Sequence, residues 1–196
     1  MIINAKTSKY DTRETPYKQI ISRNIRCRVP GHFLVGKGSV IDDFSYFSTK
    51  IEVGRFCHIA NNVSIAGGRK YKFTLGDYSS ISSGVRVWCS SDDFSCDMSV
   101  LAPAGIELPG SSINGDVSIS ELTIIGCNSV IMPDNDIPAG VAIGALSFVP
   151  AGFKFEEWFL YAGIPIRPIR RRDKAKVLRQ KKYFLDQLSL SRKRQK

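Results

Sequence analysis

Large apolar residues recur at every sixth position along most of this chain. The period appears in three blocks, which are Val35, Ile41, Phe47, Val53, Ile59 and Ile65, then Leu75, Ile81 and Val87, then Ile119, Ile125, Ile131, Ile137, Ile143 and Val149. An α-helix repeats every 3.6 residues and an amphipathic strand every two, so neither element alone explains a period of six. A long series of short, similar repeats is typical of a solenoid, in which each coil stacks on the one before it.

A small residue often follows the apolar one, as in Val35-Gly36, Ile59-Ala60 and Ile125-Gly126. Each hexapeptide therefore predicts one short strand, whose apolar side chain points inward, and one tight turn, where a small residue is favoured. Three hexapeptides make one triangular coil, so the fifteen hexapeptides predict about five coils. We expect an all-β fold, a parallel β-helix that spans residues 30–172.

Three segments fall outside this repeat. Residues 1–29 precede it, and we expect them to pack on the solenoid. Residues 88–116 interrupt it with a long polar stretch, and excursions of this length from a regular fold usually carry function. Residues 173–196 predict a C-terminal α-helix with a basic tail, with Asp173 as N-cap and an apolar face made of Val177, Leu178, Phe184, Leu185 and Leu188.

The charge of the chain is concentrated at its C-terminal end. The 196 residues carry a net charge of +10, and residues 167–196 carry 13 Lys and Arg against 2 Asp and Glu, a net charge of +11. Such a segment indicates an anionic partner: a phosphate-bearing small molecule, nucleic acid or a membrane surface. The segment has few aromatic residues and no nucleic-acid-binding motif, so we expect no nucleic-acid partner.

Several further classes are disfavoured. No apolar run reaches 18 residues, so we expect no membrane span. The N-terminus lacks the apolar region of a signal peptide, and the five cysteines show no paired spacing, which favours a reducing cytoplasm. The two histidines, His32 and His58, are too few for a three-histidine site, so we expect no metal.

The repeat and two stretches near its end resemble the hexapeptide-repeat acyltransferases. Gly144-Ala145-Leu146-Ser147-Phe148-Val149 is similar to the segment whose backbone contacts the pantetheine arm of acyl-CoA, and Gly163-Ile164-Pro165-Ile166-Arg167-Pro168-Ile169-Arg170 is similar to the exit segment that meets the CoA phosphates. The resemblance implies a left-handed β-helix, a homotrimer with sites between subunits, and acetyl-CoA or another acyl-CoA as co-substrate. It implies CoA-binding roles for Gly126, Gly144, Ala145, Pro165, Arg167 and Arg170. Forked guanidinium groups suit phosphate oxygens.

The polar insertion narrows this resemblance. Familiar members of the family place a catalytic histidine near the start of the loop, but here the stretch reads Ser90-Ser91-Asp92-Asp93-Phe94-Ser95. It is similar to a sub-family from bacterial polysaccharide gene clusters, which includes N-acyltransferases of dTDP-4-amino-4,6-dideoxyglucose and some sugar O-acetyltransferases. The resemblance therefore implies a nucleotide-linked amino sugar as acceptor, in O-antigen or capsule synthesis.

The missing histidine favours an amine over a hydroxyl as the attacking group. A sugar hydroxyl needs a competent general base, and a carboxylate with a pKa of about 4 is a poor one unless burial raises that pKa. Amines that titrate near a pH of about 8 are already partly in the nucleophilic form and mainly need positioning. We expect Asp93 to bind the amine or take its proton, with Asp92 as the other candidate and Ser83 orienting the same amine.

Two other functions stay open from the sequence. The first is a sugar O-acetyltransferase of the same fold, in which His58 or an unusually basic aspartate would act as base. The second is a binder of nucleic acid or a membrane surface that uses the basic residues 167–196.

Overall fold

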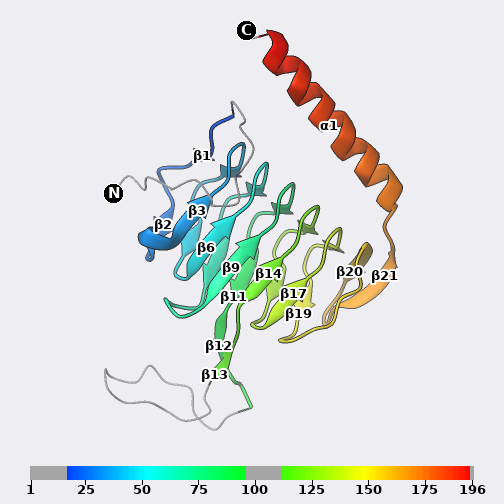
Figure 1. Ribbon diagram of the computed structural model, residues 1–196. Helices are drawn as coiled ribbons and strands as arrows, with labels where there is room; N and C mark the ends of the chain where they lie inside the picture. Colours follow the sequence, from blue (N-terminus) through cyan, green and yellow to red (C-terminus); the bar gives the residue numbers. More distant parts are fainter. Residues whose placement is uncertain (1–16, 96–111, 195–196) are drawn as a thin grey trace.

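The hexapeptides form short strands that stack as a parallel β-solenoid (Figure 1). The structure is a computed structural model that describes residues 17–95 and 112–194. Equivalent strands of successive coils pair in parallel, so three hexapeptides make one coil with three faces. The solenoid has about six turns, which confirms the expected all-β, β-helix architecture.

Each face of the solenoid is one sheet. The first has eight strands: β1 (Ile20–Ile21), β4 (Val40–Ile41), β7 (His58–Ile59), β10 (Ser80–Ile81), β15 (Ile124–Ile125), β18 (Ala142–Ile143), β20 (Phe159–Ala162) and the antiparallel β21 (Arg167–Arg171). The second has six: β2 (Arg26–Cys27), β5 (Tyr46–Phe47), β8 (Ser64–Ala66), β11 (Arg86–Trp88), β16 (Val130–Ile131) and β19 (Phe148–Val149). The third has five: β3 (Phe33–Val35), β6 (Lys50–Val53), β9 (Lys72–Leu75), β14 (Val117–Ile119) and β17 (Asn135–Ile137).

The residues at every sixth position fill the interior in stacked columns. Ile59, Ile81 and Ile125 are in register on neighbouring strands, and each is fully buried. Burial of one such side chain contributes about 1.5–3 kcal/mol. The sequence period therefore creates a continuous core that runs the length of the solenoid.

The solenoid begins before residue 30, which corrects the expected boundary and adds a coil. Strands β1 and β2 pair in parallel with β4 and β5, as Ile21↔Ile41 and Cys27↔Phe47. A short 3-10 helix, η1 (Pro30–His32), follows them and inserts two residues before Val35. Cys27 precedes Val35 by eight residues rather than six, so the first coil is out of phase with the others.

Three corners join the faces, and two of them carry additions. We call the turns from the eight- to the six-stranded sheet the glycine corner (residues 82–84, 126–128 and 144–146). The turns from the six- to the five-stranded sheet are the hairpin corner (residues 28–32, 67–71 and 89–92). There an antiparallel pair, β12 (Ser90–Asp92) and β13 (Ser112–Asn114), projects from the solenoid (Figure 1).

The third corner, from the five- to the eight-stranded sheet, is covered by the C-terminal helix α1 (Lys174–Arg194). Asp173 caps the helix as expected, since its Oδ1 accepts a hydrogen bond from the backbone N–H of Lys176 at 2.9 Å. The Phe184 ring meets the rings of Phe56 and Tyr78 edge-on. Phe184 of the expected apolar face therefore contacts the coils, and the helix runs back toward the first coils (Figure 1). Over the described ranges, no helix has the length and apolar character required to span a membrane.

Two buried cysteines make stability sensitive to alkaline pH. Burial raises the pKa of both Cys57 and Cys89 from 9.0 to about 12. Above pH 9 the unfolded chain therefore loses thiol protons that the folded chain keeps, and the free energy of unfolding falls as pH rises. We expect a loss of up to about 1.4 kcal/mol per pH unit for each thiol. Urea unfolding between pH 8 and 10 measures it, and the Cys57→Ala, Cys89→Ala protein should show a shallower decline. Parallel curves for the two proteins would refute the assignment.

Candidate active site

Several of the residues predicted to act on acyl-CoA lie in one line along the glycine corner. Because Ile81, Ile125 and Ile143 are in register, the residues that follow them also stack coil on coil. The first row consists of Ser82, Gly126, Gly144 and Ala162, and the second of Ser83, Cys127, Ala145 and Gly163. Neighbouring coils are about 4.8 Å apart, so the row from Ser83 to Gly163 extends over about 14 Å. The structure thus brings Ser83, Gly126, Gly144 and Ala145 onto one edge.

The glycines keep this edge narrow. A Cβ added at Gly126 would lie 2.4 Å from the backbone nitrogen of Ala145, a distance that real Cβ atoms do not reach. Cys127 and Ala145 are exposed on the outer side of the same turns. The two rows therefore present backbone and small side chains, a surface that an extended thioester arm can follow closely.

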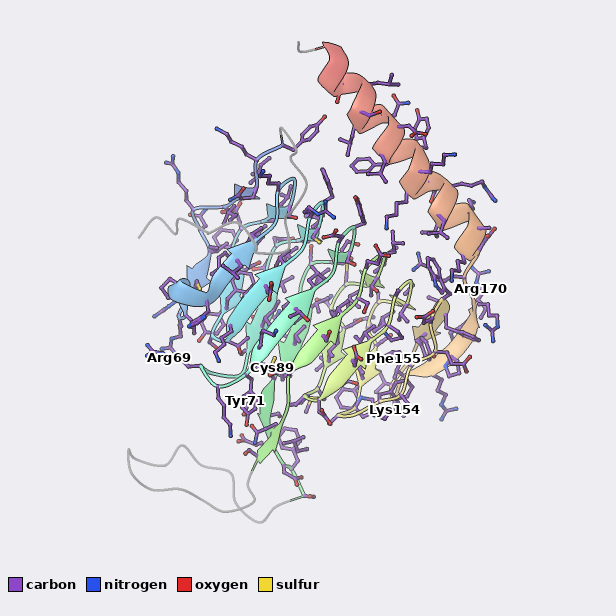
Figure 2. All side chains as sticks on the ribbon, viewed as in Figure 1. Arg69, Tyr71, Cys89, Lys154, Phe155 and Arg170 are labelled. Carbon is purple, nitrogen blue, oxygen red and sulfur yellow. The ribbon has the colours of Figure 1, made fainter. Side chains whose placement is uncertain are left out.

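The basic exit lies at the C-terminal end of this edge. Gly163 is linked to the preceding coil, since its N–H donates to Ser147 Oγ at 3.2 Å, and Pro165 follows two residues later. From there β21 turns back along β20 and pairs Arg167 with Ala162 and Arg170 with Leu160. Both guanidinium groups are exposed, and Figure 2 shows Arg170 at the outer end of the solenoid. Arg167 is thus next to the corner, and Arg170 lies farther along the same ribbon.

Ser83 is held in a defined orientation at the corner. Its hydroxyl donates to Asn61 Oδ1 at 2.5 Å, from the turn of the preceding coil. The lone pairs of that hydroxyl can then accept a hydrogen bond from an incoming N–H group. This geometry suits the predicted role of orienting an amine.

The two loop aspartates lie on the projecting hairpin. Asp92 is exposed at the end of β12, opposite Ser112. Asp93 is half-buried, and its Oδ1 accepts hydrogen bonds from the N–H and the Oγ of Ser95, at 2.9 and 2.6 Å. Such an Asx turn fixes the carboxylate. The rest of the predicted loop, residues 96–111, lies outside the described residues.

A single chain does not bring Ser83 and Asp93 together. Ser83 precedes strand β11 at the glycine corner, whereas Asp93 follows β12 beyond the hairpin corner. The extended stretch from Arg86 to Asp92 spans on the order of 20 Å at about 3.3 Å per residue. The predicted catalytic residues therefore occupy opposite ends of one face.

His58 lies on the eight-stranded sheet, next to the strand that precedes Ser83. Its ring is exposed on β7, as the alternation with buried Ile59 predicts, and its Nε2 lies 2.8 Å from Asp42 Oδ2. It also lines a hollow beneath Phe184 and Leu188 of helix α1. In this chain His58 is therefore three residues before Asn61, the hydrogen-bond partner of Ser83, on the strand that leads into the glycine corner.

Sequence reasoning missed a group of basic residues at the hairpin corner. Arg28, His32, Lys50 and Arg69 line one hollow of about 270 Å³, although they are far apart in the chain. The sequence does contain one signal for this group, a four-residue insertion between the repeat residues Ile65 and Leu75 that includes Arg69 and Lys70. In the described part of the chain, no cluster of His, Cys, Asp and Glu side chains is arranged to hold a metal ion.

Comparison with known proteins agrees with this arrangement. No protein-family model matches the chain. An Escherichia coli protein, dTDP-4-amino-4,6-dideoxy-D-glucose acyltransferase, is 36% identical over 146 residues, which cover 71% of this chain and 72% of that protein. AntD, an N-acyltransferase from Bacillus cereus solved with dTDP and 3-hydroxybutyryl-CoA, superposes with a TM-score of 0.75 at 31% identity, over 87% of this chain and 88% of AntD.

These similarities extend over most of both proteins. They confirm the expected resemblance to acyltransferases of nucleotide-linked amino sugars. The chain belongs to the dTDP-4-amino-4,6-dideoxyglucose acyltransferases of the hexapeptide-repeat family.

Proposed function

We propose that this protein transfers an acyl group, most simply acetyl, from CoA to the amino group of a dTDP-linked amino-deoxy sugar such as dTDP-4-amino-4,6-dideoxyglucose. The observation that carries the proposal is the row from Ser83 to Gly163, which ends in exposed arginines. AntD variants bind dTDP-4-amino-4,6-dideoxyglucose together with coenzyme A, so both ligand classes occur on this fold. Thiol release from acetyl-CoA that requires this amino sugar tests the proposal, and no release with any short acyl-CoA would contradict it.

The geometry supports a direct transfer. The thioester lies along the glycine corner, with backbone N–H groups near Gly126 or Gly144 available to its carbonyl oxygen. The amine nitrogen forms the amide bond to the carbonyl carbon, the C–S bond breaks and CoA leaves. Asp93 takes the proton that the nitrogen loses, and Ser83 orients the amine. Arg167 and Arg170 bind the CoA phosphates, with Pro165 shaping the turn before them.

A second observation supports the choice of Ser83 and Asp93. Solved AntD variants replace one serine, by alanine, cysteine or threonine, and one aspartate, by alanine or asparagine. Those two AntD positions are ten residues apart (94 − 84), and Ser83 and Asp93 have the same spacing (93 − 83). The agreement favours this pair over Asp92.

We further propose a homotrimer in which the hairpin of one copy meets the glycine corner of the next. The support is the separation of Ser83 and Asp93 within one chain, because a site that uses both needs two copies. Sedimentation that gives the mass of three chains tests it, and a monomeric active enzyme would contradict it. The sequence features support a cytoplasmic enzyme of O-antigen or capsule synthesis.

Labelling of Cys127 tests whether CoA binds along the glycine corner. It is exposed between Ser83 and Ala145 in the same row, so bound CoA should shield it. We expect saturating CoA to slow iodoacetamide labelling of Cys127 at least about fivefold, as measured by peptide mass spectrometry. Cys27 in the first coil is half-buried and should label at the same rate with and without CoA. Equal labelling of Cys127 in both conditions would place the thioester arm elsewhere.

A further inference from the structure

The basic hollow at the hairpin corner collects positive charge from three separate coils. Arg28 follows β2, Lys50 begins β6, and Arg69 lies in the insertion between β8 and β9. His32, at the end of η1, completes the rim. The hollow has a volume of about 270 Å³, and no acidic side chain from residues 17–95 or 112–194 lines it.

These cations lack counter-charges within the described residues. No ion pair joins Arg28, Lys50 or Arg69 to a described carboxylate, and the Lys50 Nζ donates a hydrogen bond to the backbone oxygen of Lys70, at 3.4 Å. Residues 1–166 as a whole carry a net charge of −1 (15 basic and 16 acidic), so this concentration is local. Forked guanidinium groups around a small hollow match the geometry of phosphate oxygens.

The hollow lies beside the hairpin that carries Asp93. A Cβ added at Gly67 would lie 2.5 Å from the Cβ of Cys89, so the Arg69 insertion is packed against the base of that hairpin. Figure 2 shows Arg69, Tyr71 and Cys89 close together on this side of the molecule. The distance along the solenoid from the first coil to the coil that carries the hairpin is about 14 Å, at about 4.8 Å per coil. A diphosphate in the hollow would thus lie at the same corner of the solenoid as the hairpin that carries Asp93.

Space in the hollow is provided in part by Gly31. A Cβ added there meets no atom within 4 Å, and its backbone does not adopt a positive φ. A larger side chain at this position would enter open space without a clash. Gly31 therefore offers a way to block the hollow while leaving the coil intact.

We propose that this hollow binds the diphosphate of the nucleotide-linked sugar and so directs the sugar amine toward the hairpin. The inference rests on the proposed function, because it names the subsite for the acceptor of that reaction. It gives Arg28, Lys50 and Arg69 a role in binding the acceptor, distinct from that of Arg167 and Arg170 toward CoA.

The test is calorimetric titration of the full chain with dTDP, and with thymidine as the probe that lacks phosphates. We expect wild type to bind dTDP at least tenfold more tightly than thymidine. The double variant Arg28→Gln, Arg69→Gln and the single variant Gly31→Leu should each weaken dTDP binding at least tenfold. Both should keep the thermal midpoint of wild type, and the KM for acetyl-CoA should be unchanged. Arg179→Gln, which removes an exposed cation from helix α1, is the matched control and should bind dTDP as wild type does.

Two results would overturn the inference. If both variants bind dTDP like wild type, the diphosphate is bound elsewhere, while acyl transfer by wild type would still stand. If wild type binds no dTDP, the hollow is no nucleotide subsite. Thiol release with an amino sugar on another carrier would then preserve acyl transfer, and no release with any acceptor would refute the proposed function as well.

Discussion

Replacing Asp93 with asparagine should lower kcat by a factor of about 10²–10⁴, the range typical for loss of a general base. Asparagine keeps an oxygen that can accept the hydrogen bonds from Ser95, so the Asx turn should persist. The amide cannot take the proton of the amine, and it removes the negative charge that attracts an ammonium group. We therefore expect the loss in kcat, with a thermal midpoint close to that of wild type.

The neighbouring carboxylate is the matched control. Asp92 is one residue away on the same hairpin and is exposed, so Asp92→Asn removes the same charge from the same surface. Its kcat should stay within about threefold of wild type. If Asp93→Asn is fully active, Asp93 is not the base. If Asp92→Asn alone is inactive, the role belongs to Asp92.

Replacing Asp77 with alanine should destabilise the solenoid by about 3–5 kcal/mol, because it removes the partner of a buried cation. Arg55 and Asp77 lie in successive turns of the corner beneath helix α1. The Asp77 carboxylate accepts hydrogen bonds from the Arg55 backbone N–H at 2.7 Å, from Nε at 3.1 Å, and from Nη2. The Arg55 side chain is 9% exposed, so water cannot replace this carboxylate fully. Urea unfolding at a fixed protein concentration measures the loss.

An exposed ion pair serves as the control for this prediction. Arg171 and Glu156 are 3.5 Å apart with side chains 74% and 67% exposed, and Glu156→Ala should change stability by less than about 0.5 kcal/mol. The double variant Arg55→Leu, Asp77→Leu should be more stable than Asp77→Ala, since it leaves no unpaired charge. A loss below about 1 kcal/mol for Asp77→Ala would show that the ion pair does not hold the coils together.

Much of the fold was predictable because the repeat is local and regular. One inward residue in six fixes a strand and its register, so the column through Ile125 and Ile143 follows from spacing alone. The first coil was missed because η1 inserts two residues and shifts the phase between Cys27 and Val35. A period search in one phase cannot detect such a shift.

The candidate site was predictable only where it follows the repeat. Ala145 shares the edge with Ser83 because each is two residues after the inward isoleucine of its coil, and Gly126 occupies the adjacent row, one residue after Ile125. The position of Asp93 relative to Ser83 depends on the hairpin, which leaves the repeat. The basic hollow combines side chains from three coils, and no local motif connects Arg28 with Arg69.

The most direct test of the central claim compares two acceptors that differ only at the reacting atom. Purified enzyme and acetyl-CoA are mixed with dTDP-4-amino-4,6-dideoxyglucose, or with its counterpart that carries a hydroxyl at the same carbon, and thiol release is followed. We predict release with the amine alone, with mass spectrometry showing an N-acetyl product. Equal or faster release with the hydroxyl acceptor would contradict N-acylation and would identify the protein as an O-acetyltransferase.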